Sequence, residues 1–262
     1  MTPANAGPQL VVASRDNPLV RQLRRLGAQG TAYRKLGQFW VEGEHLCRAA
    51  FERQLRPALL VVSESWLPHL PAPWIQRADR IVVLADRLFA DVSTLESPAQ
   101  VGFVLDLPEA RPAQRDLPTV VLDRIQDAGN VGSILRSAAA FGFPQVLAVQ
   151  GTAGLWSPKV LRAGMGAHFG LHLAEGLHID QVMALGLPLV VTSSHQGVDL
   201  PGLGLPSPCA WVFGHEGQGV GPALLDQSAV QVRIPQPGGE ESLNVAAAAA
   251  ICLYSSATGM RR

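Results

Sequence analysis

The chain has 262 residues, of which 47% are hydrophobic and 16% charged, and its 21 basic and 21 acidic side chains leave a formal net charge of +0. This much apolar sequence can bury one large core or two modest cores, which excludes an intrinsically disordered protein. The neutral balance excludes nucleic-acid binding driven by net charge alone. No apolar run is as long as a membrane span and the first residues lack a signal-peptide pattern, so we expect a cytoplasmic protein without a membrane partner.

Residues 1–110 are predicted to form a small α/β domain. Asn17 followed by Pro18 is typical of a helix start, and Leu19, Leu23 and Leu26 then recur on one helix face. Short apolar runs beyond this helix alternate with helical segments, which indicates a mixed sheet and helix domain. The expected strands are 38–42, 59–62, 80–85 and 101–105, and the expected helices are 44–53 and 88–94.

Basic residues are concentrated near the N-terminus, where Asp16 is the only acid among the first 35 residues. The arginines of the first predicted helix project toward solvent. Such a stripe suits a solvated helix face as well as contact with phosphates, and both readings stay open. The candidate RNA-binding residues here are Arg21, Arg24, Arg25, Arg34 and Lys35.

Residues 111–118 are the expected linker, because Pro108, Pro112 and Pro118 interrupt the pattern among polar residues. From residue 119 to 262, near-continuous apolar strands alternate with helices, which is typical of a mostly parallel sheet covered on both faces. The expected strands are 119–122, 145–149, 189–192, 210–213 and 230–234, and the expected helices are 131–140, 158–164, 179–185, 221–226 and 243–255.

The cysteines and histidines do not suggest a metal site. Cys47, Cys209 and Cys252 lie far apart in or beside apolar sequence, so we expect buried, reduced thiols. His168 and His172 are four residues apart, but the residues between them alternate like a strand and no third ligand is near. The sequence therefore predicts no bound metal.

Three blocks of the second domain place glycine and polar residues where strands end. They are Asn130–Arg136 at a helix start, the run 213–219 after an apolar strand, and the segments 234–235 and 241–246. Ligands of α/β sheets bind at such strand exits. The glycines at 217–221 also suggest a dinucleotide-binding turn, but only about 40 residues follow, too few for that fold.

These blocks, in this order and spacing, resemble the motifs of the SPOUT superfamily, specifically the SpoU/TrmH branch that methylates ribose 2′-hydroxyls in RNA. The motif matches are 130–142, 213–219 and 234–246, and residues 14–110 resemble the substrate-binding domain that many members carry in front. The resemblance implies a deep trefoil knot in the C-terminal domain, a homodimer, and S-adenosyl-L-methionine as cofactor. It implies methyl transfer to a ribose 2′-hydroxyl of structured RNA, ribosomal RNA rather than transfer RNA because of the separate N-terminal domain.

The resemblance also implies which residues form the site. The cofactor would be bound by Thr192, Ser193, Gly214, Glu216, Gly219, Ile234, Gln236, Leu243 and Asn244, and the catalytic set would be Arg136, Asn130, Glu216, Ser242 and Asn244. Lys159 and Arg162 would join Arg136 in contacting RNA. A guanidinium is too basic to serve readily as a general base, so we expect Arg136 to bind the target phosphate or the developing alkoxide, with direct proton removal left open.

Simpler roles remain open for several of these residues. Asn130, Ser242 or Asn244 could act as helix caps alone, and Glu216 could be an exposed acid of a turn. At the level of the whole protein, the alternatives are a transfer-RNA ribose methyltransferase, an enzyme that methylates a base nitrogen, and a noncatalytic RNA-binding protein that keeps the fold.

Overall fold

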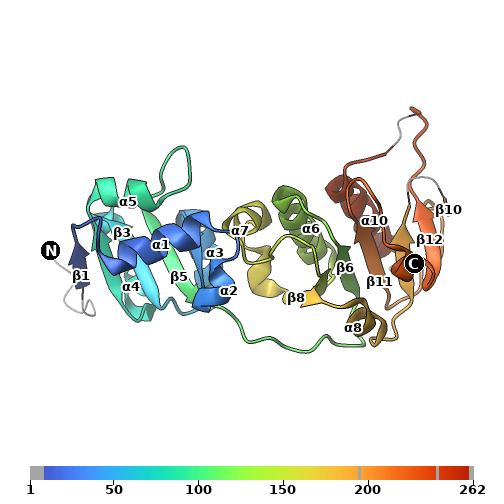
Figure 1. Cartoon of the computed structure of the whole chain (residues 1–262), viewed down its shortest axis with the longest axis horizontal. Helices are drawn as coiled ribbons and strands as arrows, with labels where there is room; N and C mark the ends of the chain where they lie inside the picture. The colour runs from blue at the N-terminus through green and yellow to red at the C-terminus, as the bar shows by residue number, and fades with distance from the viewer. Residues whose placement is uncertain (1–8, 194–195, 240–241, 260–262) are drawn as a thin grey trace. The chain divides into compact units, whose positions relative to one another are not determined.

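The structure, a computed structural model, describes residues 9–193, 196–239 and 242–259 (Figure 1). The chain forms two compact units: residues up to Glu109 together with Trp156–Phe169, and Ala110–Leu155 together with the residues from Gly170 onward. The predicted second domain, 119–262, is therefore interrupted by the segment 156–169. Aromatic packing explains why this segment belongs to the first unit, because the Phe39 ring centroid lies 4.7 Å from that of Trp156 and 6.5 Å from that of Phe169.

Within the described residues, the first unit has a five-stranded sheet in the order β1-β4-β3-β5-β2. Strands β1, β4 and β3 are parallel, whereas β5 runs antiparallel to both β3 and β2. The strands are β1 (Gln9–Val12), β2 (Gln38–Glu42), β3 (Leu59–Ser63), β4 (Ile81–Leu84) and β5 (Val101–Asp106). The expected small α/β domain is confirmed.

Helix α1 of this unit begins as the sequence predicts. The Asn17 side chain accepts a hydrogen bond of 2.9 Å from the Leu19 amide, and Leu23 and Leu26 are buried. The helices are α1 (Pro18–Ala28), α2 (Ala32–Leu36), α3 (Glu44–Glu52), α4 (Ala72–Arg77), α5 (Asp86–Val92) and α7 (Pro158–Gly164), with 3-10 turns at Leu67–His69 and Ala167–Gly170.

The strand-like reading of residues 168–172 is wrong. Met165 and Gly166 both have positive φ, +50° and +89°, and these reverse the chain into the 3-10 turn Ala167–Gly170. The next strand begins only at His172. His168 and His172 consequently belong to different units.

The described part of the second unit contains a seven-stranded sheet in the order β10-β12-β9-β11-β6-β7-β8, and every pairing is parallel. The predicted mostly parallel sheet is confirmed. All residues of β6, β7 and β11 are buried, as their largely apolar sequences indicate. The strands are β6 (Thr119–Asp123), β7 (Gln145–Val149), β8 (His172–Leu177), β9 (Leu189–Thr192), β10 (Val198–Asp199), β11 (Ala210–Gly214) and β12 (Ser228–Arg233).

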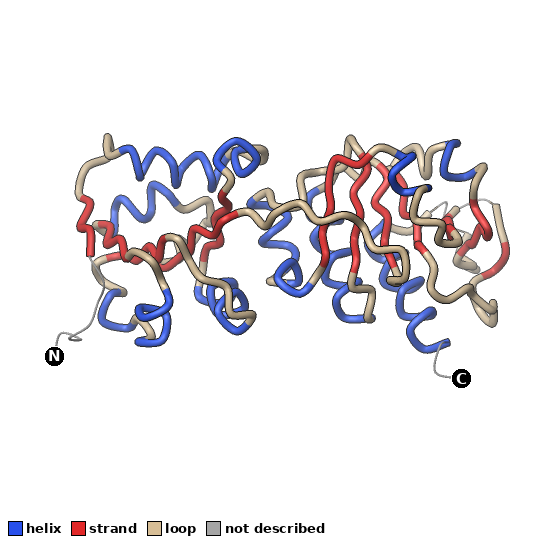
Figure 2. The backbone as a smooth tube through the Cα atoms, turned by 90° about the horizontal axis from the view of Figure 1, so that it is seen from below, coloured by secondary structure: helices blue, strands red, loops and turns tan. Residues whose placement is uncertain are grey.

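Helices cover both faces of this sheet (Figure 2). Adjacent residues of a strand point to opposite faces. Val212 of β11 belongs to a core cluster with residues of α8 and α9, whereas its neighbour Trp211 donates a buried hydrogen bond of 2.8 Å to Ser256 of α10. The helices are α6 (Ala128–Phe141), α8 (Ile179–Met183), α9 (Pro222–Leu225) and α10 (Val245–Gly259).

All three cysteines are buried and unpaired, as expected. Burial raises the pKa of Cys209 to about 11 and that of Cys252 to about 12. These thiols are therefore protonated at neutral pH, which makes them poor nucleophiles. No helix in the described parts of the chain is long and apolar enough to cross a membrane.

Candidate functional site

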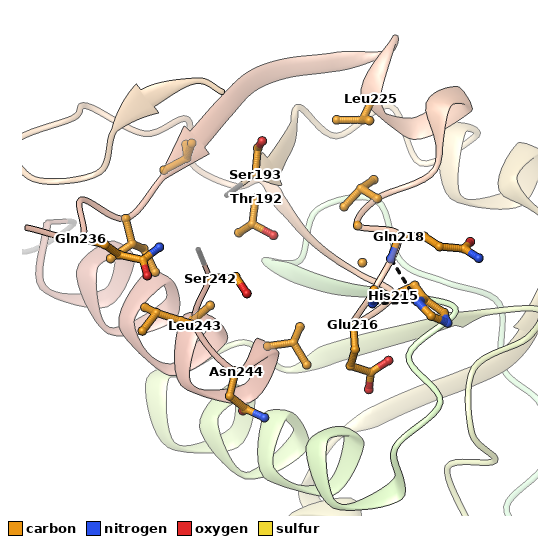
Figure 3. A pocket seen from close by; sticks show the side chains of 18 residues that line it. Thr192, Ser193, His215, Glu216, Gln218, Leu225, Gln236, Ser242, Leu243 and Asn244 are labelled. Carbon is orange, nitrogen blue, oxygen red and sulfur yellow. Dashed lines mark hydrogen bonds between the residues drawn. The ribbon is translucent and has the colours of Figure 1, made fainter. Parts of the chain in front are cut away.

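A cavity of about 680 Å³ lies at the carboxyl ends of β9, β11 and β12 (Figure 3). The loop after β11 lines one side, and the segment from β12 into α10 lines the side across from it. Ser242, expected in the catalytic set, lines the cavity as well. The residues expected around a cofactor all lie on its wall, namely Thr192, Ser193, Gly214, Glu216, Gly219, Ile234, Gln236, Leu243 and Asn244.

The loop after β11 is folded tightly on itself. A Cβ atom at Gly214 would lie 2.3 Å from the backbone of Gly219 and Val220, so only glycine fits there. The backbones of His215 and Gly219 exchange hydrogen bonds of 3.1 and 2.8 Å. The His215 Nδ1 atom accepts bonds from the amides of Gly217 and Gln218, at 3.0 and 3.2 Å (Figure 3). The loop wall therefore has a fixed shape.

Glu216 of this loop bonds the start of helix α6. Its Oε1 atom accepts hydrogen bonds from the Asp127 amide at 3.2 Å and from the Asn130 side chain at 3.1 Å, and Oε2 accepts one from the Gln126 amide at 3.3 Å. Burial by itself raises the pKa of Glu216, but these hydrogen bonds and one from its own amide lower it below its usual value. A carboxylate is also favoured at a helix N-terminus. Glu216 is thus an anionic link to α6.

Asn130 and Asn244 extend this link to helix α10. The Asn244 Nδ2 atom donates a hydrogen bond of 2.9 Å to Asn130 Oδ1. The Asn244 Oδ1 atom accepts bonds from the amides of Ala246 and Ala247, at 2.9 and 3.2 Å, and so caps α10. Glu216, Asn130 and Asn244 therefore form one hydrogen-bonded chain beside the cavity.

The capping role that the sequence left open for Asn130 belongs to Asp127. The Asp127 side chain accepts a hydrogen bond of 2.7 Å from the Asn130 amide. The Asn130 side chain is left to bridge Glu216 and Asn244. A cap was expected from either Ser242 or Asn244, and Asn244 provides it.

Arg136 lies outside this chain of hydrogen bonds. It follows Asn130 by six residues on α6, about 9 Å along the helix axis. Its side chain is exposed, and within the described residues it has no hydrogen-bond or ion-pair partner. All five N–H donors of its guanidinium can therefore bind an incoming anion.

Sequence analysis missed two residues at the end of β6. Asp123 is 1% exposed, and its carboxylate accepts bonds from Arg124 Nε at 2.9 Å and from the Gly221 amide at 2.7 Å. Arg124 also donates to the Gln218 side chain at 3.1 Å, and its hydrogen bond to Asp123 raises its pKa further. An adjacent pair of opposite charges directly after a buried strand was the available signal.

The cavity wall has the groups that a nucleoside ligand needs. Gln236 Oε1 is buried and has no hydrogen-bond partner among the described residues. Leu243 is 39% exposed, unusual for leucine, and lines the cavity together with Ile234. A buried acceptor without a partner in the described structure, beside apolar side chains that line a cavity, suits a flat, partly polar ring system.

Residues 118–254 match the SpoU rRNA methylase family, and residues 17–102 match the MRM3-like substrate binding domain. The chain belongs to the SpoU rRNA methylase family. It is 32% identical over 224 residues to RlmP, the 23S rRNA (guanosine(2553)-2'-O)-methyltransferase of Bacillus subtilis, covering 84% of this chain and 88% of that protein.

Two solved structures with bound AdoMet are similar to this SpoU methylase over nearly its full length. An rRNA methyltransferase from Sinorhizobium meliloti has 25% identity and a TM-score of 0.83, with 95% of this chain and 98% of that chain covered. The SpoU methyltransferase AviRb from Streptomyces viridochromogenes has 26% identity and a TM-score of 0.82, with 94% and 98% covered. The cofactor of this family is S-adenosylmethionine.

Apart from Arg136, the cations expected to contact RNA lie on the first unit of this SpoU methylase. Arg24 of α1 bonds Asp91 of α5 at 3.2 Å, and Arg162 of α7 bonds the Thr94 hydroxyl at 2.7 Å. Because Asp91 and Thr94 are three residues apart, α1 and α7 present their cations near one another. The other cations of this set are Arg21, Arg25, Arg34, Lys35 and Lys159. No cluster of residues able to hold a metal ion is found among the described residues.

Proposed function

We propose that this SpoU methylase transfers the methyl group of S-adenosylmethionine to a ribose 2′-hydroxyl of ribosomal RNA. One observation carries the proposal: the hydrogen bonds Glu216–Asn130–Asn244 connect the wall of a cofactor-sized cavity to the helix that carries Arg136, a residue without a partner in the described part of the chain. The names of its relatives support ribosomal RNA as the substrate, since both RlmP and the mitochondrial rRNA methyltransferase 3 of Homo sapiens act on that class of RNA.

The cavity residues divide into two roles toward the cofactor. Ile234 and Leu243 would flank the adenine ring, and Gln236 Oε1 would accept a hydrogen bond from its polar edge. The Gly214–Gly219 loop lets backbone groups approach the nucleoside without Cβ atoms in the way. The bound cofactor supplies a sulfonium-activated methyl group. The protein must then hold the ribose oxygen in line with that methyl group.

Arg136 would hold the RNA at the point of reaction. Its exposed guanidinium can bind the phosphate next to the target ribose or stabilise negative charge on the 2′-oxygen as its proton leaves. A guanidinium keeps its proton at neutral pH, so we favour charge stabilisation over direct proton removal. Ser242, on the cavity wall beside Asn244, would contribute a hydroxyl for positioning.

The first unit would bind RNA through the cations of α1, α2 and α7. Arg24 and Arg162 are already paired with Asp91 and Thr94, which fixes their positions on the surface. Such contacts would position phosphates without reading base sequence. The expected affinity therefore depends strongly on salt.

We infer a homodimer formed through the outer face of α6 and α10. Ile251 and Tyr254 are 41% and 57% exposed on α10, and Tyr254 packs edge-on against Phe141 of α6. These apolar side chains on a helix rich in alanine suit a second copy of the same face. The trefoil knot stays a prediction that rests on the family, and the cytoplasm is the compartment we propose.

Methyl transfer tests the function directly. The purified protein is incubated with labelled S-adenosylmethionine and either unmodified ribosomal RNA or unmodified transfer RNA, and the RNA is then digested with alkali. We expect alkali-resistant labelled dinucleotides from the ribosomal pool alone, because a 2′-O-methyl group blocks cleavage. Label in mononucleotides would indicate base methylation, and label from transfer RNA alone would overturn the ribosomal assignment.

The variant Arg136→Ala is assayed beside the wild type under the same conditions. Binding of the cofactor by the wild type without any transfer to either RNA pool would favour a noncatalytic RNA-binding protein. Size-exclusion chromatography with light scattering tests the dimer, and Tyr254→Arg should shift the molar mass to that of a monomer.

A further inference from the structure

We propose that Asp123 and Arg124 are positioning residues that hold the loop 214–221 against the turn between β6 and α6, and so set the affinity for S-adenosylmethionine. The inference rests on the proposed function in so far as this loop forms the cofactor wall. Neither residue lines the cavity. Both act through the loop.

The backbone of Arg124 is the first observation. Its φ is +58°, a left-handed conformation that residues with a side chain rarely adopt. Within the described residues only Gln54 and Met165 share this feature among non-glycines. Strain of this kind persists where surrounding contacts enforce it, and here those contacts can be named.

Asp123 supplies the first of these contacts. Its carboxylate is almost completely buried at the end of β6, and a buried charge requires partners. Arg124 binds it in bidentate fashion, through Nε at 2.9 Å and Nη2 at 3.1 Å. The Gly221 amide donates a third bond at 2.7 Å. The Asp123 side chain therefore holds the end of the loop at Gly221 through the backbone amide of that residue.

Arg124 supplies the second set of contacts. Its Nη1 atom donates to the Gln218 side chain at 3.1 Å, and its Nη2 atom donates to the Gly219 carbonyl at 3.4 Å. Glycines make room for the side chain: a Cβ at Gly221 would lie 3.2 Å from Arg124 Nη2, and one at Gly151 would lie 3.2 Å from Arg124 Cγ. The Arg124 side chain therefore lies between Gly151, which follows β7, and the loop that follows β11.

The loop is thus held at two points by one short stretch of chain. Glu216 bonds Gln126, Asp127 and Asn130, whereas Gln218, Gly219 and Gly221 bond Arg124 or Asp123. Both ties end within residues 123–130. The cofactor wall and the first turn of the helix that carries Arg136 consequently keep one relative position.

The test uses Arg124→Gly in the full-length protein. Glycine adopts a positive φ without strain, so this variant removes the guanidinium without adding backbone strain at position 124. Gln54→Gly is the matched control, because Gln54 is exposed and also left-handed, with a φ of +61°, but lies in the first unit. Gln218→Ala removes one acceptor of Arg124 and gives a second test if Arg124→Gly does not fold. Because Gln218 also lines the cavity, the decisive result in this variant is an unchanged dissociation constant, which would count against the proposal.

The dissociation constant for S-adenosylmethionine is measured by calorimetry without RNA, and KM, kcat and Tm are measured beside it. We expect Arg124→Gly to raise the dissociation constant and the KM for the cofactor at least tenfold, with kcat at saturation changed less than threefold. Arg124→Lys, which cannot bond Asp123 and the loop together, should fall in between, Gln218→Ala should raise the dissociation constant a few fold, and Gln54→Gly should match the wild type.

A lower Tm with an unchanged dissociation constant in Arg124→Gly would overturn the proposal and leave the pair a purely structural role. An unchanged constant in Gln218→Ala would equally count against it. If the wild type binds the cofactor but methylates no RNA, the proposed function fails. The ratio of the dissociation constants of Arg124→Gly and wild type still tests the role of Asp123 and Arg124. Absence of cofactor binding by the wild type would overturn both.

Discussion

The Asn130 side chain donates a hydrogen bond of 3.1 Å to the carboxylate of Glu216, although the two residues are 86 positions apart in the chain. This single contact ties the cavity wall to the start of helix α6. Its partner contact, from Asn244 to Asn130 at 2.9 Å, ties the same point to α10. Loss of either hydrogen bond should therefore affect the loop after β11, α6 and α10 together.

Glu216→Gln should destabilise the fold at neutral pH. The variant keeps the size of the side chain but loses the charge that accepts three hydrogen bonds at the start of α6. The loss should be moderate, because Glu216 is exposed and solvent screens its charge. Urea unfolding at neutral pH measures it, and equal stability of variant and wild type would contradict the assignment.

The pH dependence of this difference has a defined sign. The pKa of Glu216 is lower in the folded protein than in the unfolded chain. The stability it contributes is therefore fully present above the unfolded pKa and is lost as the pH falls through the folded pKa. The gap in unfolding free energy between wild type and Glu216→Gln should shrink on acidification. A gap that grows in acid would reverse the sign and refute the argument.

Gly214→Ala should abolish tight cofactor binding. Its Cβ would lie 2.3 Å from backbone atoms of Gly219 and Val220, so the loop must open. Gly217→Ala is the matched change in the same loop, where the nearest atom lies at 3.8 Å, and it should have a much smaller effect. Calorimetric titration with S-adenosylmethionine compares the two. Similar losses in both variants would mean that the close approach at Gly214 is unimportant.

Arg136→Ala should reduce kcat by about 100-fold or more, since removal of one group that stabilises developing charge has effects of this size. Tm and cofactor affinity should stay unchanged, because the side chain is exposed and has no partner in the described structure. Arg136→Lys should recover little, since a lysine cannot make bidentate contacts. Full activity of Arg136→Lys would show that charge alone is sufficient.

Ser256→Ala should lower the free energy of unfolding by about 1–3 kcal/mol, the cost of leaving a buried donor unpaired. Ser256 is the acceptor for the buried Trp211 indole N–H at 2.8 Å, which joins α10 to the sheet. The exposed Thr258, two residues further along the same helix, gives the control variant Thr258→Ala. Urea unfolding curves of both variants check the prediction, and equal curves would contradict it.

Much of the fold could be predicted from apolar patterning. Strands β2, β7 and β9 begin and end where the sequence predicts, because each has a mostly buried apolar run of at least three residues. Strand β1 and helices α2 and α4 were missed, since each has only four to six residues and too little sequence for a period to show. The parallel order of the strands depends on crossovers that no local pattern encodes.

The site was predictable in a different way. Its glycines and polar residues were found from their places at strand exits and from the family motifs, but the pairing of Asn130 with Glu216 was not. Asp123 and Arg124 went unnoticed because their partners lie more than 90 residues further along the chain. Asp127, not Asn130, caps α6, and the sequence offers both as suitable caps within one helical turn.

The placement of Trp156–Phe169 in the first unit affects when that unit can finish folding during synthesis. The chain crosses between the units three times, after Glu109, Leu155 and Phe169. Phe39 lacks two of its ring partners until both Trp156 and Phe169 have been synthesised. The N-terminal unit therefore cannot complete its packing on the ribosome before more than half of the chain has emerged. A protein truncated after the linker would lack that aromatic contact, so the first unit cannot complete its packing without residues that follow part of the second unit in the chain.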